Sequence, residues 1–167
     1  MNDYVTPLIQ KYRKSGVLVD TNLLILFFVG SFQRGQITQF KWTCTFTEDD
    51  YDMLCQFLGK FEKVITTPNI LTEVSNLAGQ LDSRLKPDFF SVFAQGIKAL
   101  EEFHQPSAEI AATPAFIKFG LTDTAIANLA EGKYLVITED HRVTGYLRSR
   151  NIDMLNFNHL RGAMYLS

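Results

Sequence analysis

The sequence has few of the residues and segments that would place it in a specialised class of protein. It contains only two cysteines and three histidines. Cys44 and Cys55 have the spacing neither of metal ligands nor of a redox pair, so we expect free thiols and no zinc site. The longest apolar run, residues 23–29, is far shorter than the about 20 residues that span a bilayer. Because no basic segment followed by an apolar one opens the chain, no signal peptide is expected. These absences favour a cytoplasmic protein that does not enter a membrane.

An excess of positive charge is also lacking. The formal net charge is -2, which counts against a protein that coats nucleic acid without regard to sequence. Local basic contacts remain compatible with this value, since opposite charges cancel in the sum. No Gly-x-Gly-x-x-Gly follows a strand, which argues against a dinucleotide-binding fold. With 46% hydrophobic residues, no repeat and no linker, residues 1–167 are predicted to form a single domain.

Short apolar strands alternate with helical patterns along the chain. Strands are expected at residues 17–19, 63–67, 134–138 and 152–157. Strands of this kind, buried on both faces and separated by helices, predict an α/β protein with three α/β/α layers around a central parallel sheet. Helices are expected at 3–14, from 21 onward, at 48–59, from 68 onward, at 87–103, at 121–130 and from 141 onward. Residues 31–47 are expected to form a loop or weak extended structure, residues 104–120 a loop with a short helical turn, and the chain after the last strand a short tail.

Four acids occupy comparable positions in this pattern. Asp20 and Asp140 directly follow strands, whereas Glu73 and Asp123 lie in the early turns of helices. Each acid taken singly has an ordinary explanation as a helix cap or as a partner of the helix dipole. Taken together, four carboxylates brought to one edge of a parallel sheet would repel one another, and a divalent cation would relieve that repulsion. Carboxylate ligands suit Mg²⁺ or Mn²⁺.

Four segments that contain these acids resemble, in order, the motifs of PIN-domain nucleases, and the small VapC-like ribonuclease toxins are the nearest comparison. The resemblance implies a PIN-like fold and a metal-dependent endoribonuclease that cleaves RNA with Mg²⁺ or Mn²⁺, leaving a 5′-phosphate and a 3′-hydroxyl. It also implies that Asp20, Glu73, Asp123 and Asp140 are metal-site acids and that Asn22 and Thr138 support the site. The matching segments are Val17-Leu18-Val19-Asp20-Thr21-Asn22, Leu71-Thr72-Glu73-Val74, Leu121-Thr122-Asp123-Thr124-Ala125-Ile126 and Leu135-Val136-Ile137-Thr138-Glu139-Asp140.

Several alternatives stay open at this point. A toxin would have an antitoxin partner, but residues 31–47 and 104–120 make the chain longer than a minimal toxin. A PIN-like module could instead act only by binding protein or RNA. A haloacid-dehalogenase-like phosphatase also carries an acid after its first strand, but Asn22-Leu23-Leu24 lacks the further acid which that class requires. The phenylalanine-rich helix after Pro87 is compatible with a core position or with a homodimer surface.

Overall fold

One parallel sheet of five strands organises the chain. The computed structural model describes residues 4–165, with side chains to residue 162. Within that range the strand order is β3-β2-β1-β4-β5, and every pairing is parallel. The predicted α/β class with a central parallel sheet is therefore confirmed. The strands are β1 (Val17–Val19), β2 (Val64–Thr66), β3 (Glu101–Glu102), β4 (Leu135–Thr138) and β5 (Met154–Asn156).

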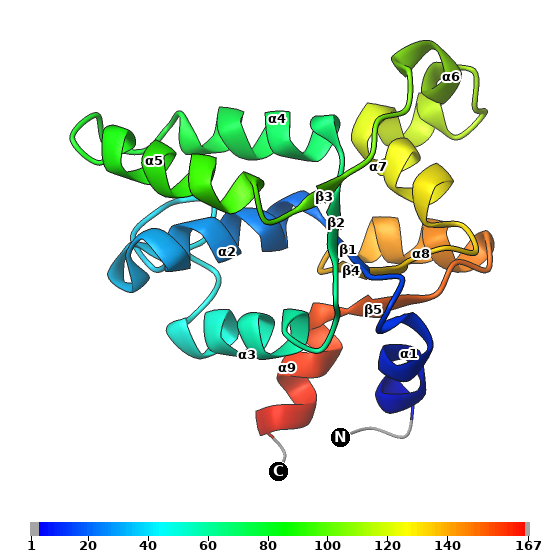
Figure 1. The fold of residues 1–167 in the computed structure, drawn as a ribbon, viewed down its shortest axis with the longest axis horizontal. Helices are drawn as coiled ribbons and strands as arrows, with labels where there is room; N and C mark the ends of the chain where they lie inside the picture. The colour runs from blue at the N-terminus through cyan, green and yellow to red at the C-terminus, as the bar shows by residue number, and fades with distance from the viewer. Residues whose placement is uncertain (1–3, 166–167) are drawn as a thin grey trace.

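The helices cover both faces of this sheet (Figure 1). After β1 the chain moves outward through β2 to β3, and it then returns to place β4 on the other side of β1. The crossovers before β3 use α2 (Thr21–Phe32), α3 (Glu48–Leu58), α4 (Pro68–Ala78) and α5 (Lys86–Ile97). The later part of the chain forms α6 (Ser107–Ala111), α7 (Phe116–Ala130), α8 (His141–Ser149) and α9 (Phe157–Tyr165), and α1 (Val5–Tyr12) precedes the sheet.

The change of direction between β1 and β4 creates a switch point in the sheet. Leu18 pairs with Ile65 of β2 on one side and with Val136 of β4 on the other. In open α/β sheets, ligands bind at such a point, outside the carboxyl ends of the strands. The residues that follow β1 and β4 therefore lie where this architecture places a functional site.

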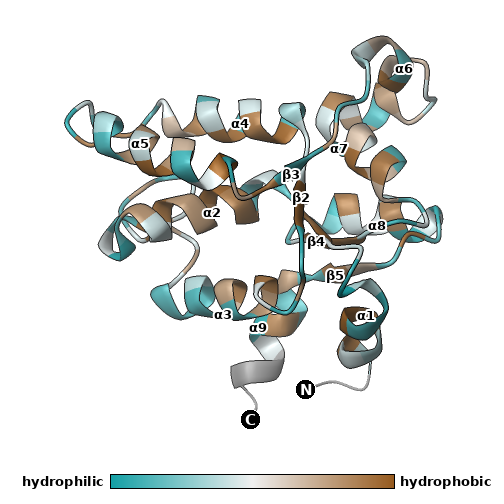
Figure 2. Cartoon of the chain, viewed as in Figure 1, coloured by the Kyte–Doolittle hydropathy of each residue, from teal (hydrophilic) through white to brown (hydrophobic). Residues whose placement is uncertain are grey.

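The core forms because the strands and the central helix are apolar on nearly all sides. All three residues of β1 and all four of β4 are buried. Helix α2 is also buried over most of its circumference, which Figure 2 shows as a largely brown helix beside the sheet. Phe89 and Phe93 of α5 are buried and pack against Phe32 and Phe28 of α2, respectively. The phenylalanine-rich helix was expected to lie in the core or to form a homodimer surface, and Phe89 and Phe93 lie in the core.

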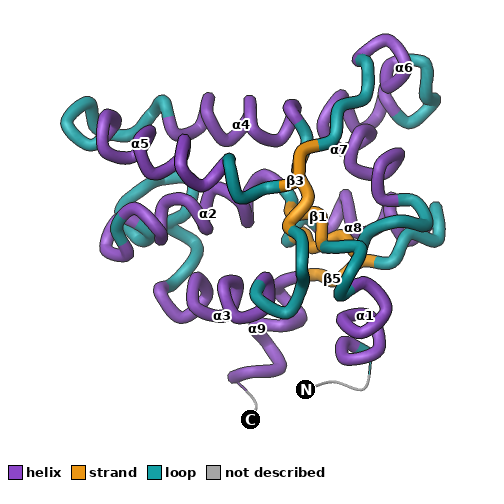
Figure 3. The backbone as a smooth tube through the Cα atoms, in the orientation of Figure 1, coloured by secondary structure: helices purple, strands orange, loops and turns teal. Residues whose placement is uncertain are grey.

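Five expectations about secondary structure were wrong in detail (Figure 3). Strand β3 was missed because Glu101–Glu102 has neither apolar character nor length. The helix expected at 87–103 ends at Ile97, so that Phe103 follows β3. The expected tail after the last strand is α9. Helix α7 begins at Phe116 and not at 121, with a break at Gly120. The expected loop at 31–47 includes a 3-10 turn at Arg34–Gln36.

Among the described residues, no helix is both long enough and apolar enough to cross a membrane.

Candidate active site

Asp20 ends β1 and caps α2. Its carboxylate accepts hydrogen bonds from the Thr21 backbone N–H at 2.6 Å and from the Thr138 hydroxyl at 2.5 Å. The side chain is buried, with 6% of Asp20 exposed. The sequence left capping and a functional role open for this residue, and the structure shows that the cap exists. A cap alone needs only the first of these two bonds, and the second ties Asp20 to the neighbouring strand.

Asp140 repeats this arrangement at the end of β4, as the sequence predicted. Its Oδ1 caps α8 by accepting hydrogen bonds from the backbone N–H groups of Arg142 at 2.6 Å and Val143 at 3.3 Å. The Asp140 backbone N–H donates to the Thr138 hydroxyl oxygen at 3.0 Å. Thr138 therefore connects the two acids that follow β1 and β4 across the switch point.

Glu73, in the second turn of α4, is held by two hydroxyl groups from other helices. The Thr21 hydroxyl at the start of α2 donates to Oε2 at 2.8 Å, and the Thr122 hydroxyl of α7 donates to Oε1 at 2.6 Å. Glu73 is nevertheless exposed to solvent. A glutamate that served only the dipole of its own helix would need neither contact. Glu73 is thus oriented toward the start of α2 and the part of α7 that contains Thr122.

Asp123 reaches the same region because α7 is broken immediately before it. Gly120 has φ 74° and ψ -169°, a backbone conformation that side-chain-bearing residues rarely adopt. The break starts a second helical segment, whose first turns carry Thr122 and Asp123. The Asp123 carboxylate lies 3.8 Å from the guanidinium of Arg142, which is mostly exposed.

The carboxylates influence one another electrostatically. Burial, followed by the negative charges of Asp140 and Glu73, raises the pKa of Asp123 to about 6, although Arg142 opposes this rise. The pKa of Asp20 is raised to about 7, chiefly by burial. The hydrogen bond from Thr138 opposes that rise, whereas the charges of Asp123 and Asp140 add to it. Hydrogen bonds through Thr138, Thr21 and Thr122 connect the segments that carry the four predicted acids.

Asn22 lies next to this cluster but contacts a different acid. Its side-chain amide donates to Glu139 Oε1 at 3.1 Å, and the backbone carbonyl of Glu139 accepts a hydrogen bond from Asn158. Burial raises the pKa of Glu139, although the bond from Asn22 opposes this. Asn22 therefore positions Glu139, which becomes a fifth carboxylate at the border of the cluster.

The donor set suits a hard cation chemically, but the acids do not form a finished cage. Among the described residues, no three Asp, Glu, His or Cys side chains are arranged as a group that could hold a metal ion. Mg²⁺ commonly retains several water ligands and binds through only one or two carboxylates, so a closed cage is not required. Oxygen ligands and unrelieved negative charge are the features that fit such an ion.

Three residues of the site were not singled out from the sequence. Thr21 and Thr122 each adjoin one of the acids in sequence, and that adjacency was the only available signal. Arg142 gave no signal, because its approach to Asp123 depends on how α7 and α8 pack. Lys118 and His141, which lie near Asp123 and Asp140 in the sequence, are exposed.

Comparison with known proteins adds no relative, since the chain matches no protein-family model and no curated protein.

Proposed function

We propose that the chain is a divalent-metal-dependent endoribonuclease of the PIN type, acting on RNA in the cytoplasm. The observation that carries this proposal is the convergence of Asp20, Asp123 and Asp140 at the switch point, where burial and mutual repulsion raise the pKa values of Asp20 and Asp123. A cluster of this kind is costly for a fold that gains nothing from it. The resemblance of the four surrounding segments to PIN motifs supplies the reaction.

Asp20, Asp123 and Asp140 would hold Mg²⁺ or Mn²⁺, with Glu73 binding a second ion or orienting the attacking water. When bound, the ion would lower the pKa of water and offset the charge that develops on the phosphodiester. Hydrolysis adds the water oxygen to phosphorus and releases the 3′ oxygen as a hydroxyl, which leaves a 5′-phosphate.

The remaining roles belong to side chains of the chain itself. The hydroxyl groups of Thr21 and Thr122 each donate a hydrogen bond to one oxygen of Glu73. These bonds hold the orientation of the carboxylate and so of its remaining lone pairs. The exposed Arg142, beside Asp123, provides a positive charge for a substrate phosphate at the rim of the acids. Thr138 keeps Asp20 and Asp140 in register.

A PIN-like module that only binds protein or RNA is the second candidate. The observation that favours it is that Asp20 and Asp140 already have a structural use as helix caps. In that case the acids would be retained for the fold, and removing the charge of Asp123, which caps no helix, would leave the biological activity unchanged.

RNA cleavage distinguishes the two candidates. Labelled single-stranded RNA is incubated with wild type, Asp20→Asn and Asp123→Asn in Mg²⁺, in Mn²⁺ and in EDTA. Glu62→Gln, which removes an exposed acid from a loop remote from the acids, is the control. The proposal expects cleavage by wild type and Glu62→Gln only, and none in EDTA. Cleavage in EDTA, or equal cleavage by Asp123→Asn, would contradict it.

The role of toxin in a toxin–antitoxin pair is a further part of the proposal, and so is a homodimer. Expression of a toxin should arrest growth, whereas the Asp123→Asn variant should not. A small open reading frame beside the gene would then be the candidate antitoxin.

A further inference from the structure

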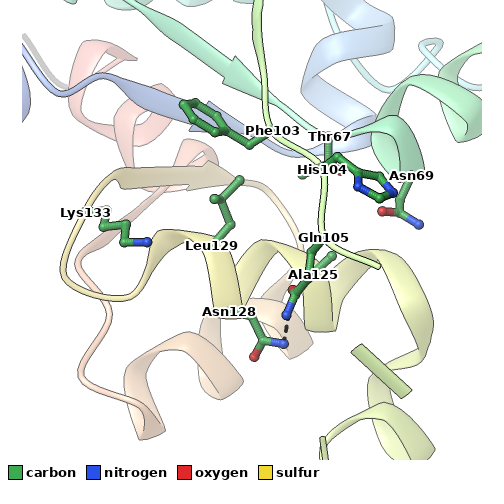
Figure 4. Close-up of a pocket in the computed structure, with 9 residues that line it drawn as sticks. All are labelled: Thr67, Asn69, Phe103, His104, Gln105, Ala125, Asn128, Leu129 and Lys133. Carbon is green, nitrogen blue, oxygen red and sulfur yellow. Dashed lines mark hydrogen bonds between the residues drawn. The ribbon is translucent and has the colours of Figure 1, made fainter. Parts of the chain in front are cut away.

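A pocket with a volume of about 200 Å³ lies between the segment that follows β3, the start of α4 and α7 (Figure 4). Its wall comes from the segment that follows β3, from the start of α4, from the second half of α7 and from Lys133 in the turn before β4. The lining residues that matter here are Asn69, Phe103, His104, Gln105, Asn128 and Lys133.

The pocket adjoins the acids along two helices. On α4, Asn69 in the pocket is four residues before Glu73. On α7, Ala125 in the pocket is three residues after Thr122, whose hydroxyl is bonded to Glu73. Residues three or four apart on a helix are neighbours, about 5–6 Å between Cβ atoms. The near wall of the pocket is therefore one helical turn from the candidate active site.

Its chemistry is opposite to that of the acids. No carboxylate lines the pocket, whereas three carboxamides, two aromatic rings and a lysine do. Lys133 is exposed and makes no ion pair with any described residue. Pockets for drug-sized ligands occupy roughly 300–1,000 Å³. This smaller one suits a single planar ring that bears hydrogen-bonding groups.

One wall of the pocket is held in place before any ligand arrives. Asn128 donates to Gln105 Oε1 at 3.4 Å and to the Thr113 hydroxyl at 3.3 Å, and its own carbonyl oxygen accepts a bond from Arg150 at 3.3 Å. Figure 4 shows Gln105 and Asn128 joined by this contact. The Gln105 carboxamide is thereby oriented, and its amino group has no partner among residues 4–162.

We infer that the pocket accepts one unpaired base of a single-stranded RNA whose neighbouring phosphodiester lies at the acids. This inference rests on the proposed ribonuclease function and adds a base subsite to it. Proteins commonly hold unpaired bases by stacking on aromatic side chains and by hydrogen bonds to the base edge. Phe103 or His104 provides the stacking surface, and Gln105 and Lys133 provide the donors.

The test is the binding of 9-nucleotide single-stranded RNAs in Ca²⁺, with the integrity of each RNA checked on a gel. In successive oligonucleotides, one nucleotide is replaced by an abasic residue. For wild type, we expect one abasic position to weaken binding about 5-fold or more, because stacking of one base commonly contributes that much. Gln105→Ala and Lys133→Gln should weaken binding of the intact RNA roughly 3- to 10-fold. For these variants, an abasic residue at the same position should weaken binding less than about 2-fold, because the base contact is already lost.

Matched controls are Gln56→Ala and Lys60→Gln, which change exposed residues in and just after α3, outside the lining of the pocket. They should bind every RNA as wild type does. The inference is overturned if no abasic position weakens binding by wild type, or if Gln105→Ala and Lys133→Gln lose affinity equally for intact and abasic RNA.

Cleavage of the same RNAs in Mg²⁺ separates this inference from the proposed function. Cleavage that is indifferent to every abasic position would support the nuclease and overturn the base subsite. Position-dependent binding that is lost in Gln105→Ala, without cleavage, would support the subsite and contradict the nuclease. Absence of any RNA binding by wild type would overturn both.

Discussion

The Thr138 hydroxyl donates a hydrogen bond to the Asp20 carboxylate at 2.5 Å and accepts one from the Asp140 backbone N–H at 3.0 Å. One buried side chain thus connects the acids at the ends of β1 and β4. Because these strands are neighbours at the switch point, this connection fixes the spacing between the two acids.

Thr138→Val should destabilise the protein. Valine has nearly the same shape and suits a strand, so the main change is the loss of the hydroxyl. Asp20 would lose a donor and the Asp140 N–H would lose its acceptor, at a cost of about 1–3 kcal/mol in the free energy of unfolding. Urea denaturation measures this cost. Thr72→Val, on the exposed side of α4, is the control, and an equal effect of the two substitutions would contradict the role given to Thr138.

The metal-free protein should lose stability from these acids as pH rises from about 4 to about 7. The pKa values of Asp20 and Asp123 are raised to about 7 and about 6, above the ordinary value of 3.8. In this range the folded protein binds protons that the unfolded chain has released, so the free energy of unfolding falls as pH increases. Asp123→Asn should make the decline shallower in urea titrations at several pH values. If the free energy of unfolding declined equally steeply with pH in Asp123→Asn, Asp123 would not contribute to the pH dependence of stability.

Asp123→Asn should be at least as stable as wild type in EDTA at pH 8. The substitution removes repulsion from Asp140 and Glu73, and it forfeits only a 3.8 Å ion pair with the mostly exposed Arg142. Such pairs contribute about 0–1 kcal/mol. Thermal melts provide the measurement, with Glu62→Gln as the control. A large loss of stability would instead indicate that Asp123 is retained for the fold.

Arg142→Gln should shift the pH dependence of RNA cleavage. Arg142 lowers the pKa of Asp123, so its removal should raise that pKa. If cleavage requires ionised Asp123, the acidic limb of the rate profile should move to higher pH, and RNA affinity should fall. Arg148→Gln, on an exposed position of the same helix α8, should leave both properties unchanged. A fall in RNA affinity without a shift of the acidic limb would show that Arg142 contacts RNA but does not influence the pKa of Asp123.

The sequence was informative about the fold wherever strands were apolar and helices were bounded by clear signals. Strand β1 and strand β4 were located because each is a short buried run followed by an acid. Strand β3 could not be found, because Glu101–Glu102 consists of only two charged residues at the edge of the sheet. Similarly, residues 116–119 form a helical segment that continues through a break at Gly120 into the rest of α7. The local apolar pattern gave no sign of this segment.

The candidate site was partly predictable for a similar reason. The acids lie at strand ends and early helix turns, and the parallel topology brings such positions to one edge. The contacts that orient Glu73 come from Thr21 and Thr122, which are 52 and 49 residues away from it. Contacts of that range depend on how α2, α4 and α7 pack, which no local pattern encodes. Asn22 was expected to support the four acids, but it contacts Glu139.

Binding of Mn²⁺ at pH 8, followed by electron paramagnetic resonance, tests most directly whether the carboxylates at the switch point form a metal site. We predict that wild type and Glu62→Gln bind one or two ions equally well. Asp20→Asn and Asp123→Asn should bind at least about tenfold more weakly, which corresponds to roughly 1.4 kcal/mol. Failure of wild type to bind Mn²⁺, or equal binding by all four proteins, would contradict the account.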